Sequence, residues 1–199
     1  SALLKLFVPN LRGRVIEIGA GCGQFTGQLR QVAEIQHLLA VEPDLRFCAE
    51  FRKTLPDQPL VEGIISAISD PGPWNGIVSI NVLEHIWEDQ EELKIYSRML
   101  KQENGRLCLF VPARPEIFAP IDADFGHHRR YSRDDLRRKL ETAGFKILEL
   151  HYFNLIGYFA WWFNFKLMRQ RKFNSAAVRF FDRVIFPIGF GLESHLGWP

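Results

Sequence analysis

Short apolar runs alternate with longer stretches whose apolar positions recur at helical spacing through most of the chain. Such runs are typical of buried strands, and the amphipathic stretches are typical of helices packed on a sheet. The predicted strands are residues 14–19, 37–42, 59–64, 76–81, 105–112 and 145–153. The predicted helices are residues 23–35, 44–55, 88–101 and 132–144. Ser132 is the expected N-cap of the last helix, and Gly144 is its expected C-terminal glycine.

This alternation predicts βαβ units. Because their crossovers are right-handed, such units build a Rossmann-like, doubly wound α/β fold with a mostly parallel sheet flanked by helices. Ligands of these folds bind outside the carboxyl ends of the strands. We therefore expect four connections to form the binding rim, namely the glycine-rich loop after the first strand and residues 42–44, 63–66 and 81–85.

The C-terminal part of the chain departs from the alternating pattern. Residues 151–199 hold 14 of the 26 aromatic residues, with six Lys or Arg against two Asp or Glu. We therefore predict a core domain of residues 1–155 and an aromatic-rich, mostly helical extension of residues 156–199. The longest charge-free apolar stretch, residues 150–165, is 16 residues long. A membrane span needs about 20 residues, so a buried or interface-lying segment fits better.

Composition narrows the functional classes. The net charge of +2, from 25 basic and 23 acidic residues, is too balanced to indicate nucleic-acid binding. The three cysteines, Cys22, Cys48 and Cys108, are too far apart for a zinc motif or a disulfide framework, so we expect no metal and a cytoplasmic setting. The first residues carry no signal-peptide pattern. Since the chain begins with Ser1 and not methionine, we expect processing or truncation.

The glycine-rich loop, "VIEIGAGCGQFTG" over residues 15–27, carries the most specific chemistry. A dinucleotide loop would place its third glycine where Gln24 or Thr26 stands, and no Gly-Lys-Ser/Thr of a P-loop follows. The carboxylate of Glu17 would repel a pyrophosphate and attract an ammonium or sulfonium group. Glu42, at the end of the second strand, can accept hydrogen bonds from ribose hydroxyls. The loop therefore predicts a positively charged nucleoside without phosphates.

At these residues the sequence resembles the class I S-adenosylmethionine-dependent methyltransferases, in particular the small-molecule types 11 and 12. The first motif of that family, E/D-x-G-x-G-x-G, is matched by Glu17, Gly19, Gly21 and Gly23, and its second-strand acid is matched by Glu42. Residues 76–86, 126–132 and 143–154 are similar to further family segments. The resemblance covers about residues 10–155. It departs from the family at Asn75, where an Asp is usual, and in lacking a recognisable final antiparallel strand.

The resemblance implies S-adenosyl-L-methionine as cofactor and S-adenosyl-L-homocysteine as product. The cofactor-binding residues that it implies are Glu17, Gly19, Ala20, Gly21, Gly23, Glu42, Pro43, Ile64, Ile65, Asn81 and Val82. In this assignment Ile64 and Ile65 flank the adenine, and Asn81 and Val82 face the methionine end. The alternative is that the glycines only pack the first strand against its helix and that Glu42 only caps the next helix.

Candidate catalytic residues are His85, His127 and His128, and Arg130 and Tyr131 are candidates for acceptor binding. A base is needed only where the acceptor is a hydroxyl or a protonated amine, and a histidine can serve. The alternatives are that His85 caps the next helix and that residues 127–131 form a solvated basic loop.

The aromatic segment has three interpretations. It caps the core, it forms a wall for an apolar or lipid-linked acceptor, or it lies on a membrane surface through residues 156–172. In the membrane interpretation Trp161, Trp162, Phe163 and Phe165 point inward. Lys166, Arg169, Arg171 and Lys172 then meet anionic headgroups.

The sequence as a whole predicts a cytoplasmic methyltransferase, with a membrane-peripheral location on the inner face as a variant. Its expected acceptor is an oxygen or nitrogen atom of a small-molecule or lipid-linked compound. No Asn-Pro-Pro-Tyr follows the fourth strand, which disfavours an amino-methylating DNA enzyme. One alternative is a nonenzymatic S-adenosylmethionine-binding regulator or pseudoenzyme. The other is a nicotinamide-dependent oxidoreductase, which the missing third glycine disfavours.

Overall fold

The computed structural model describes residues 1–70, 72–101, 103–153, 157–158 and 161–168. The chain divides into two compact units, Ser1–Val111 and a second unit that begins at Pro112. Each unit has hydrophobic clusters of its own. No helix within the described ranges is both long enough and apolar enough to span a bilayer.

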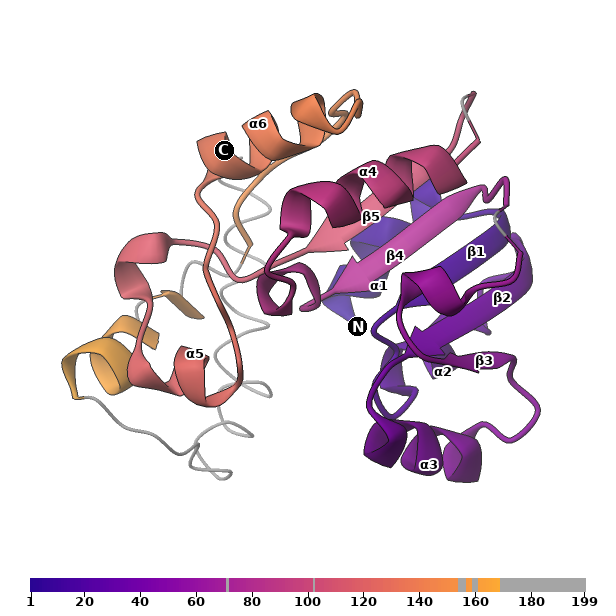
Figure 1. The fold of residues 1–199 in the computed structure, drawn as a ribbon, viewed down its shortest axis with the longest axis horizontal. Coiled ribbons are helices and arrows are strands. Elements are labelled where there is room, and N and C mark those ends of the chain that lie inside the picture. Colours follow the sequence, from indigo (N-terminus) through magenta and orange to yellow (C-terminus); the bar gives the residue numbers. More distant parts are fainter. Residues whose placement is uncertain (71, 102, 154–156, 159–160, 169–199) are drawn as a thin grey trace. The chain divides into compact units, whose positions relative to one another are not determined.

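The first unit is built on a parallel sheet of five strands. They are β1 (Gly13–Ile18), β2 (Ile35–Glu42), β3 (Leu60–Glu62), β4 (Gly76–Ile80) and β5 (Arg106–Phe110). The strand order is β3-β2-β1-β4-β5, and every neighbouring pair is parallel (Figure 1). The order reverses between β1 and β4, so the ligand-binding switch point lies at their carboxyl ends. This confirms the Rossmann-like fold and the first five predicted strands.

Helices accompany this sheet on both faces. They are α1 (Ala2–Phe7), α2 (Gln24–Leu29), α3 (Leu45–Thr54) and α4 (Asp89–Met99), with 3₁₀ turns η1 (Val8–Asn10), η2 (Ile65–Ala67) and η3 (Leu83–His85). Val15 and Val78 pack with Leu29 of α2, and Ala40 packs with Phe51 of α3, all on one face of the sheet. Because right-handed crossovers reverse side when the strand order reverses, α4 belongs to the opposite face.

One predicted helix is clearly too long. The helix after the glycine loop ends at Leu29, well before residue 35. The amide of Gly13 donates to the Glu34 carbonyl at 2.7 Å, so this segment already leads into β2. In α3 two apolar side chains lie off the buried face, since Leu45 is 67% exposed and Phe47 is 45% exposed.

The second unit contains η4 (Pro115–Ile117), α5 (Pro120–Asp124), α6 (Arg133–Thr142) and a π-helical segment, η5 (Trp162–Leu167). Among its described residues, Ala119, Ile121 and Phe165 form a buried cluster, with Trp161 packed against it. Ser132 caps α6 as predicted, since its hydroxyl accepts a hydrogen bond from the Asp135 amide at 3.1 Å. Most of the predicted extension, residues 156–199, lies outside the described residues.

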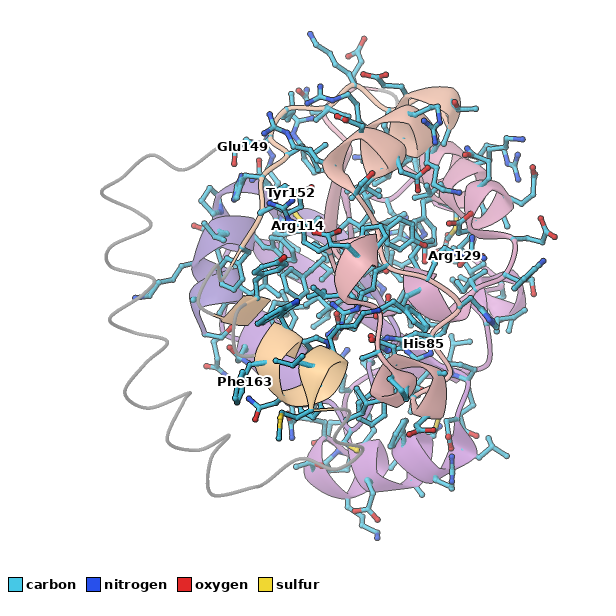
Figure 2. The ribbon with its side chains drawn as sticks, turned by 90° about the vertical axis from the view of Figure 1, so that its left-hand side faces the viewer. His85, Arg114, Arg129, Glu149, Tyr152 and Phe163 are labelled. Atoms are coloured by element: carbon cyan, nitrogen blue, oxygen red, sulfur yellow. The ribbon has the colours of Figure 1, made fainter. Side chains whose placement is uncertain are left out.

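The predicted sixth strand is wrong, because residues 145–153 form no strand in the structure. The hydroxyl of Tyr152 accepts a hydrogen bond from the Arg133 amide at 3.1 Å. The guanidinium carbon of Arg114 lies 4.2 Å from the centroid of the Tyr152 ring, and the two side chains lie together in Figure 2. The apolar alternation of this segment resembles a strand. However, at least one of its aromatic side chains packs within the second unit instead.

Candidate active site

The glycine loop connects β1 to α2 at the switch point of the sheet. Gly19, Gly21 and Gly23 have backbone φ angles of +73°, +54° and +83°. This left-handed region is open to glycine and strained for other residues. The amides of Gly19 and Ala20 donate to the Val41 carbonyl at 2.8 and 3.0 Å. The loop is therefore held at the end of β2, beside Glu42.

The three glycines differ in what surrounds them. A Cβ on Gly19 would overlap the Val82 side chain, and a Cβ on Gly23 would lie 2.8 Å from Leu55 and 2.9 Å from Phe51. A Cβ on Gly21 would meet nothing within 4 Å. Close packing thus explains Gly19 and Gly23, as the alternative interpretation expected. Gly21 instead leaves its backbone open to a ligand.

Glu42 joins the glycine loop to the start of α3. Its side chain is buried, and its Oε2 atom accepts a hydrogen bond from the Gly21 amide at 2.8 Å. The Oε1 atom accepts from the amide of Asp44, the N-cap residue of α3, at 2.9 Å. Glu42 therefore does have the local role at the start of α3 that the alternative interpretation assigned to it. Each carboxylate oxygen keeps a second lone pair, which a ribose hydroxyl can use.

Glu17 is a buried acid beneath the same loop. It is 3% exposed, and the Thr26 hydroxyl donates to its Oε2 atom at 2.6 Å. Burial raises the pKa of Glu17 to about 8, against the opposing hydrogen bond from Thr26 and with a smaller contribution from the charge of Glu42. Its carboxyl group is thus mostly protonated at pH 7. A positively charged ligand nearby would favour the ionised form.

A cavity of about 290 Å³ adjoins the loop. It is lined by Glu17, Gly19, Ala20, Gly21, Cys22, Gln24, Phe25, Phe47 and Ile80. Among these described residues none is basic, and one is a buried acid. The lining therefore fits a cationic nucleoside and not a phosphate-bearing one, as the charge argument from the sequence predicted.

The cavity contains four of the predicted cofactor residues: Glu17, Gly19, Ala20 and Gly21. The other predicted residues of the rim follow β2, β3 and β4. Ile64 is 62% exposed and Ile65 is 5% exposed, so the two differ as candidate adenine contacts. Pro43 is exposed beside Glu42, and Asn81 takes a left-handed φ of +52° after β4.

Five lining residues were not predicted from the sequence: Cys22, Gln24, Phe25, Phe47 and Ile80. For Phe47, the helical spacing of the sequence already contained a signal that this side chain lies off the buried face. The buried positions Cys48 and Phe51, followed by Leu55, already satisfy the helical spacing of α3, so an apolar residue at 47 falls outside that face. An apolar side chain off the buried face, one turn from a ligand-binding loop, is a candidate ligand contact.

The candidate catalytic histidines lie in different units. His85 is exposed and ends η3, the turn that follows Val82, and Val82 itself packs against Gly19. His127 and His128 belong to the second unit, where His128 is exposed and His127 is half-buried.

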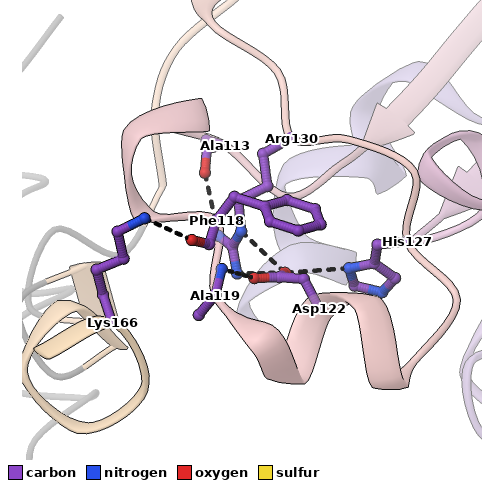
Figure 3. Close-up of polar contacts among 7 residues, drawn as sticks. All are labelled: Ala113, Phe118, Ala119, Asp122, His127, Arg130 and Lys166. Atoms are coloured by element: carbon purple, nitrogen blue, oxygen red, sulfur yellow. Dashed lines mark hydrogen bonds and ion pairs between the residues drawn. The ribbon is translucent and has the colours of Figure 1, made fainter. Parts of the chain in front are cut away.

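The two predicted acceptor-binding residues have internal contacts. Tyr131 is 1% exposed, and its backbone bonds to Pro112 and Arg114. The Arg130 side chain is 7% exposed; it contacts Asp122 at 2.8 Å and donates to the Ala113 carbonyl at 3.1 Å (Figure 3). Both residues are therefore better placed to build the second unit than to meet an acceptor directly.

The fold and the loop together define a Rossmann-like protein whose cavity at the switch point suits a cationic nucleoside. The chain belongs to the methyltransferase domain family, whose model matches residues 1–150. It is an S-adenosylmethionine-dependent methyltransferase. No curated protein matches the sequence significantly.

Solved structures share the fold at low sequence identity. A candidate methyltransferase from Bacillus halodurans has a TM-score of 0.64 and 20% identity, covering 75% of this chain and 71% of its own. An S-adenosylmethionine-dependent methyltransferase from Mesorhizobium loti has a TM-score of 0.63 and 16% identity, and the match covers 76% of this chain and 83% of that one. The cyclopropane synthase MmaA2 from Mycobacterium tuberculosis has a TM-score of 0.60 and 14% identity, and the match covers 74% of this chain and 61% of that one.

Proposed function

We propose that this methyltransferase acts on an oxygen or nitrogen atom of a small-molecule or lipid-linked acceptor. The observation that carries the proposal is the placement of His85. It ends the short η3 turn, and Val82 at the start of that turn packs against Gly19 of the cofactor loop. Oxygen and nitrogen acceptors lose a proton on methylation, and the imidazole of His85, on the turn that follows Val82, can take it.

The proposed cofactor contacts follow from the two buried acids. S-adenosylmethionine supplies a methyl group on a positively charged sulfur atom, which makes the methyl carbon electrophilic. Glu42 accepts hydrogen bonds from the ribose hydroxyls, and Glu17 balances the positive charge of the methionine part. Pro43, Ile64 and Ile65 contact the adenine, and Asn81 and Val82 contact the methionine end. Since the leaving group is good, alignment by these residues supplies much of the catalysis.

The apolar acceptor part of the proposal rests on η5. Trp162, Phe163 and Leu167 are 43%, 53% and 55% exposed, although Trp161 and Phe165 pack in the buried cluster of their unit. Exposed aromatic and aliphatic side chains favour an apolar or lipid-linked acceptor, and a membrane-peripheral location on the cytoplasmic side. Of the basic residues expected to meet headgroups, Lys166 donates a hydrogen bond to the Phe118 carbonyl at 2.8 Å. Arg169, Arg171 and Lys172 lie outside the described residues.

Methyl incorporation tests the acceptor class. The enzyme is incubated with methyl-labelled S-adenosylmethionine and a total cell extract, which is then separated into lipid, small-molecule and protein fractions. We expect label in an O-methyl or N-methyl product of the lipid or small-molecule fraction. The Gly21→Val variant is the matched control and should give none. A C-methylated or cyclopropanated product would contradict the proposal.

A further inference from the structure

Glu17 is a buried carboxyl group that uses only one of its two oxygens inside the protein. The hydroxyl of Thr26, itself fully buried in α2, donates to Oε2 at 2.6 Å. Within the described part of the chain, no group donates to the other oxygen, Oε1. Since Glu17 lines the cavity beside the glycine loop, Oε1 has capacity left for a ligand there. The side chain is only 3% exposed, so bulk water solvates its charge poorly.

The elements around Glu17 offer its negative charge no positive partner. The flanking elements β4 and α2 contain no charged residue, and α3 lines the cavity only with Phe47. The other titratable side chain of the lining is Cys22. Glu42 on β2 is the charged group that acts on Glu17, and its negative charge opposes a second one nearby. Ionisation of Glu17 therefore needs a positive charge from outside the described chain.

The two acids of the site are held in different ways. Glu42 accepts hydrogen bonds from two backbone amides, those of Gly21 and Asp44. Glu17 has the single donor Thr26, and burial outweighs this hydrogen bond, so the pKa of Glu17 rises to about 8. At neutral pH the protein alone thus keeps a proton on Glu17.

The two forms of the cofactor differ by one charge at the sulfur atom. S-adenosylmethionine and S-adenosylhomocysteine both carry an ammonium and a carboxylate group, but only S-adenosylmethionine has a positively charged sulfur. A positive charge beside a buried carboxyl group favours the ionised form of that group. The charged cofactor should therefore favour loss of the proton from Glu17 more strongly than the product does.

We propose that Glu17 couples the charge of the bound cofactor to a proton. It is neutral in the protein alone, releases its proton to solvent when S-adenosylmethionine binds, and takes a proton back when the sulfur becomes neutral in S-adenosylhomocysteine. Glu17 thereby determines specificity between substrate and product, and favours the substrate increasingly as pH rises. The inference rests on the proposed contact of Glu17 with the methionine part of the cofactor, and it does not depend on the acceptor.

A purely structural role, as a protonated acid that holds Thr26 beneath the loop, is the competing explanation. Calorimetry distinguishes the two by counting protons. Each ligand is titrated into the wild type at about pH 6.5, where its ammonium stays charged, in phosphate and in imidazole buffer. The heat of binding varies with the buffer's heat of ionisation in proportion to the protons released. We expect release of roughly 0.5–1 proton with S-adenosylmethionine and clearly less with S-adenosylhomocysteine.

Three variants assign the proton to Glu17. Glu17→Gln keeps the shape of the side chain but cannot ionise, so it should release no proton with either ligand. The matched control Glu50→Gln changes an exposed acid of α3 and should release as many protons as the wild type. Thr26→Val keeps the carboxyl group but removes its hydroxyl donor. Its affinity for S-adenosylmethionine should fall at least about tenfold, and more than its affinity for S-adenosylhomocysteine.

The pH dependence of affinity is a second readout. Because binding releases a proton, affinity for S-adenosylmethionine should rise with pH, by up to about tenfold per unit, until the pKa of Glu17 at about 8 is reached. The wild-type slope should be smaller for S-adenosylhomocysteine. In Glu17→Gln the two ligands should show the same, nearly flat, dependence.

Two results would overturn the inference. One is equal proton release with the two ligands in the wild type, which needs no variant to be seen. The other is wild-type proton release in a folded Glu17→Gln. Failure of the wild type to bind both ligands would instead contradict the proposed cofactor contacts. A product methylated at carbon would contradict the proposed acceptor and leave the number of released protons unaffected.

Discussion

At the residue scale, the glycines of the glycine loop share a backbone conformation but differ in their surroundings. Gly19 and Gly23 leave no room for a side chain, whereas Gly21 leaves open space next to the cavity. The sequence motif could not separate these roles, because it reports only that glycine is present. Surrounding side chains from distant strands and helices, such as Val82 and Phe51, make the difference.

Substitution of Gly21 by alanine should mainly affect the cofactor. The left-handed φ of +54° adds strain of about 1–2 kcal/mol, which urea unfolding measures. Because the added methyl group projects into the open space, we also expect weaker S-adenosylhomocysteine binding by calorimetry. Gly27→Ala is the matched control: it lies inside α2, a Cβ there meets nothing within 4 Å, and alanine should stabilise by about 0.5–1 kcal/mol. Equal binding by both variants would refute this role of Gly21.

The buried acid Glu17 should make stability depend on pH. Its folded pKa of about 8 lies above its ordinary value of 4.5, so the folded state holds a proton that the unfolded state has lost. The free energy of unfolding should therefore fall by up to about 1.4 kcal/mol per pH unit as pH rises from 4.5 to 8. Denaturant unfolding at several pH values measures this slope.

Glu17→Gln removes the titration and keeps the shape of the side chain. We expect it to be less sensitive to pH in this range and more stable than the wild type at pH 8. The exposed Glu50→Gln serves as control and should keep the wild-type slope. A Glu17→Gln variant that keeps the wild-type slope would show that Glu17 is not the group responsible.

At the element scale, periodicity predicted the sheet well and the segment ends less well. The strands of the first unit are buried apolar runs, and a run of apolar residues in the sequence indicates burial. The strands could therefore be predicted from the pattern. Residues 145–153 have a similar pattern without forming a strand, because a strand also needs a partner edge, which the pattern does not encode. The capping residue Ser132 was predictable because its hydrogen bond is local.

The turn after α5 is an element whose purpose became visible only in the structure. Glycine at 126 and histidine at 127 were noted as a family-like stretch, but nothing in the sequence pointed to Asp122 as their partner. Gly126→Ala should cost about 1–2 kcal/mol, since alanine disfavours the φ of +79°. It should also weaken the contact between Nδ1 of His127 and Oδ1 of Asp122, which lie 3.2 Å apart, and so shift the His127 signals in nuclear magnetic resonance. Unchanged His127 signals in a destabilised Gly126→Ala variant would contradict a role of this turn in placing His127.

At the scale of the whole molecule, strand order explains why a cofactor site could be predicted from one motif. In the order β3-β2-β1-β4-β5, the loop after β1 lies at the switch point with Glu42 beside it on β2. The topology thus brings together residues that the sequence separates. The proposed acceptor site is less predictable, because the long connections and aromatic segments that would build it have packing that no short motif specifies.

The central claim is that Glu42 and Gly21 hold S-adenosylmethionine at this switch point. Calorimetric titration with S-adenosylhomocysteine tests it most directly, with NAD as the competing ligand and Glu42→Ala and Gly21→Val as variants. We predict binding of S-adenosylhomocysteine by the wild type, no binding of NAD, and affinity lowered at least about tenfold in both variants, as expected when a charged hydrogen-bond partner is lost or the ligand space is filled. Binding of NAD alone, or unchanged S-adenosylhomocysteine affinity in both folded variants, would contradict the account.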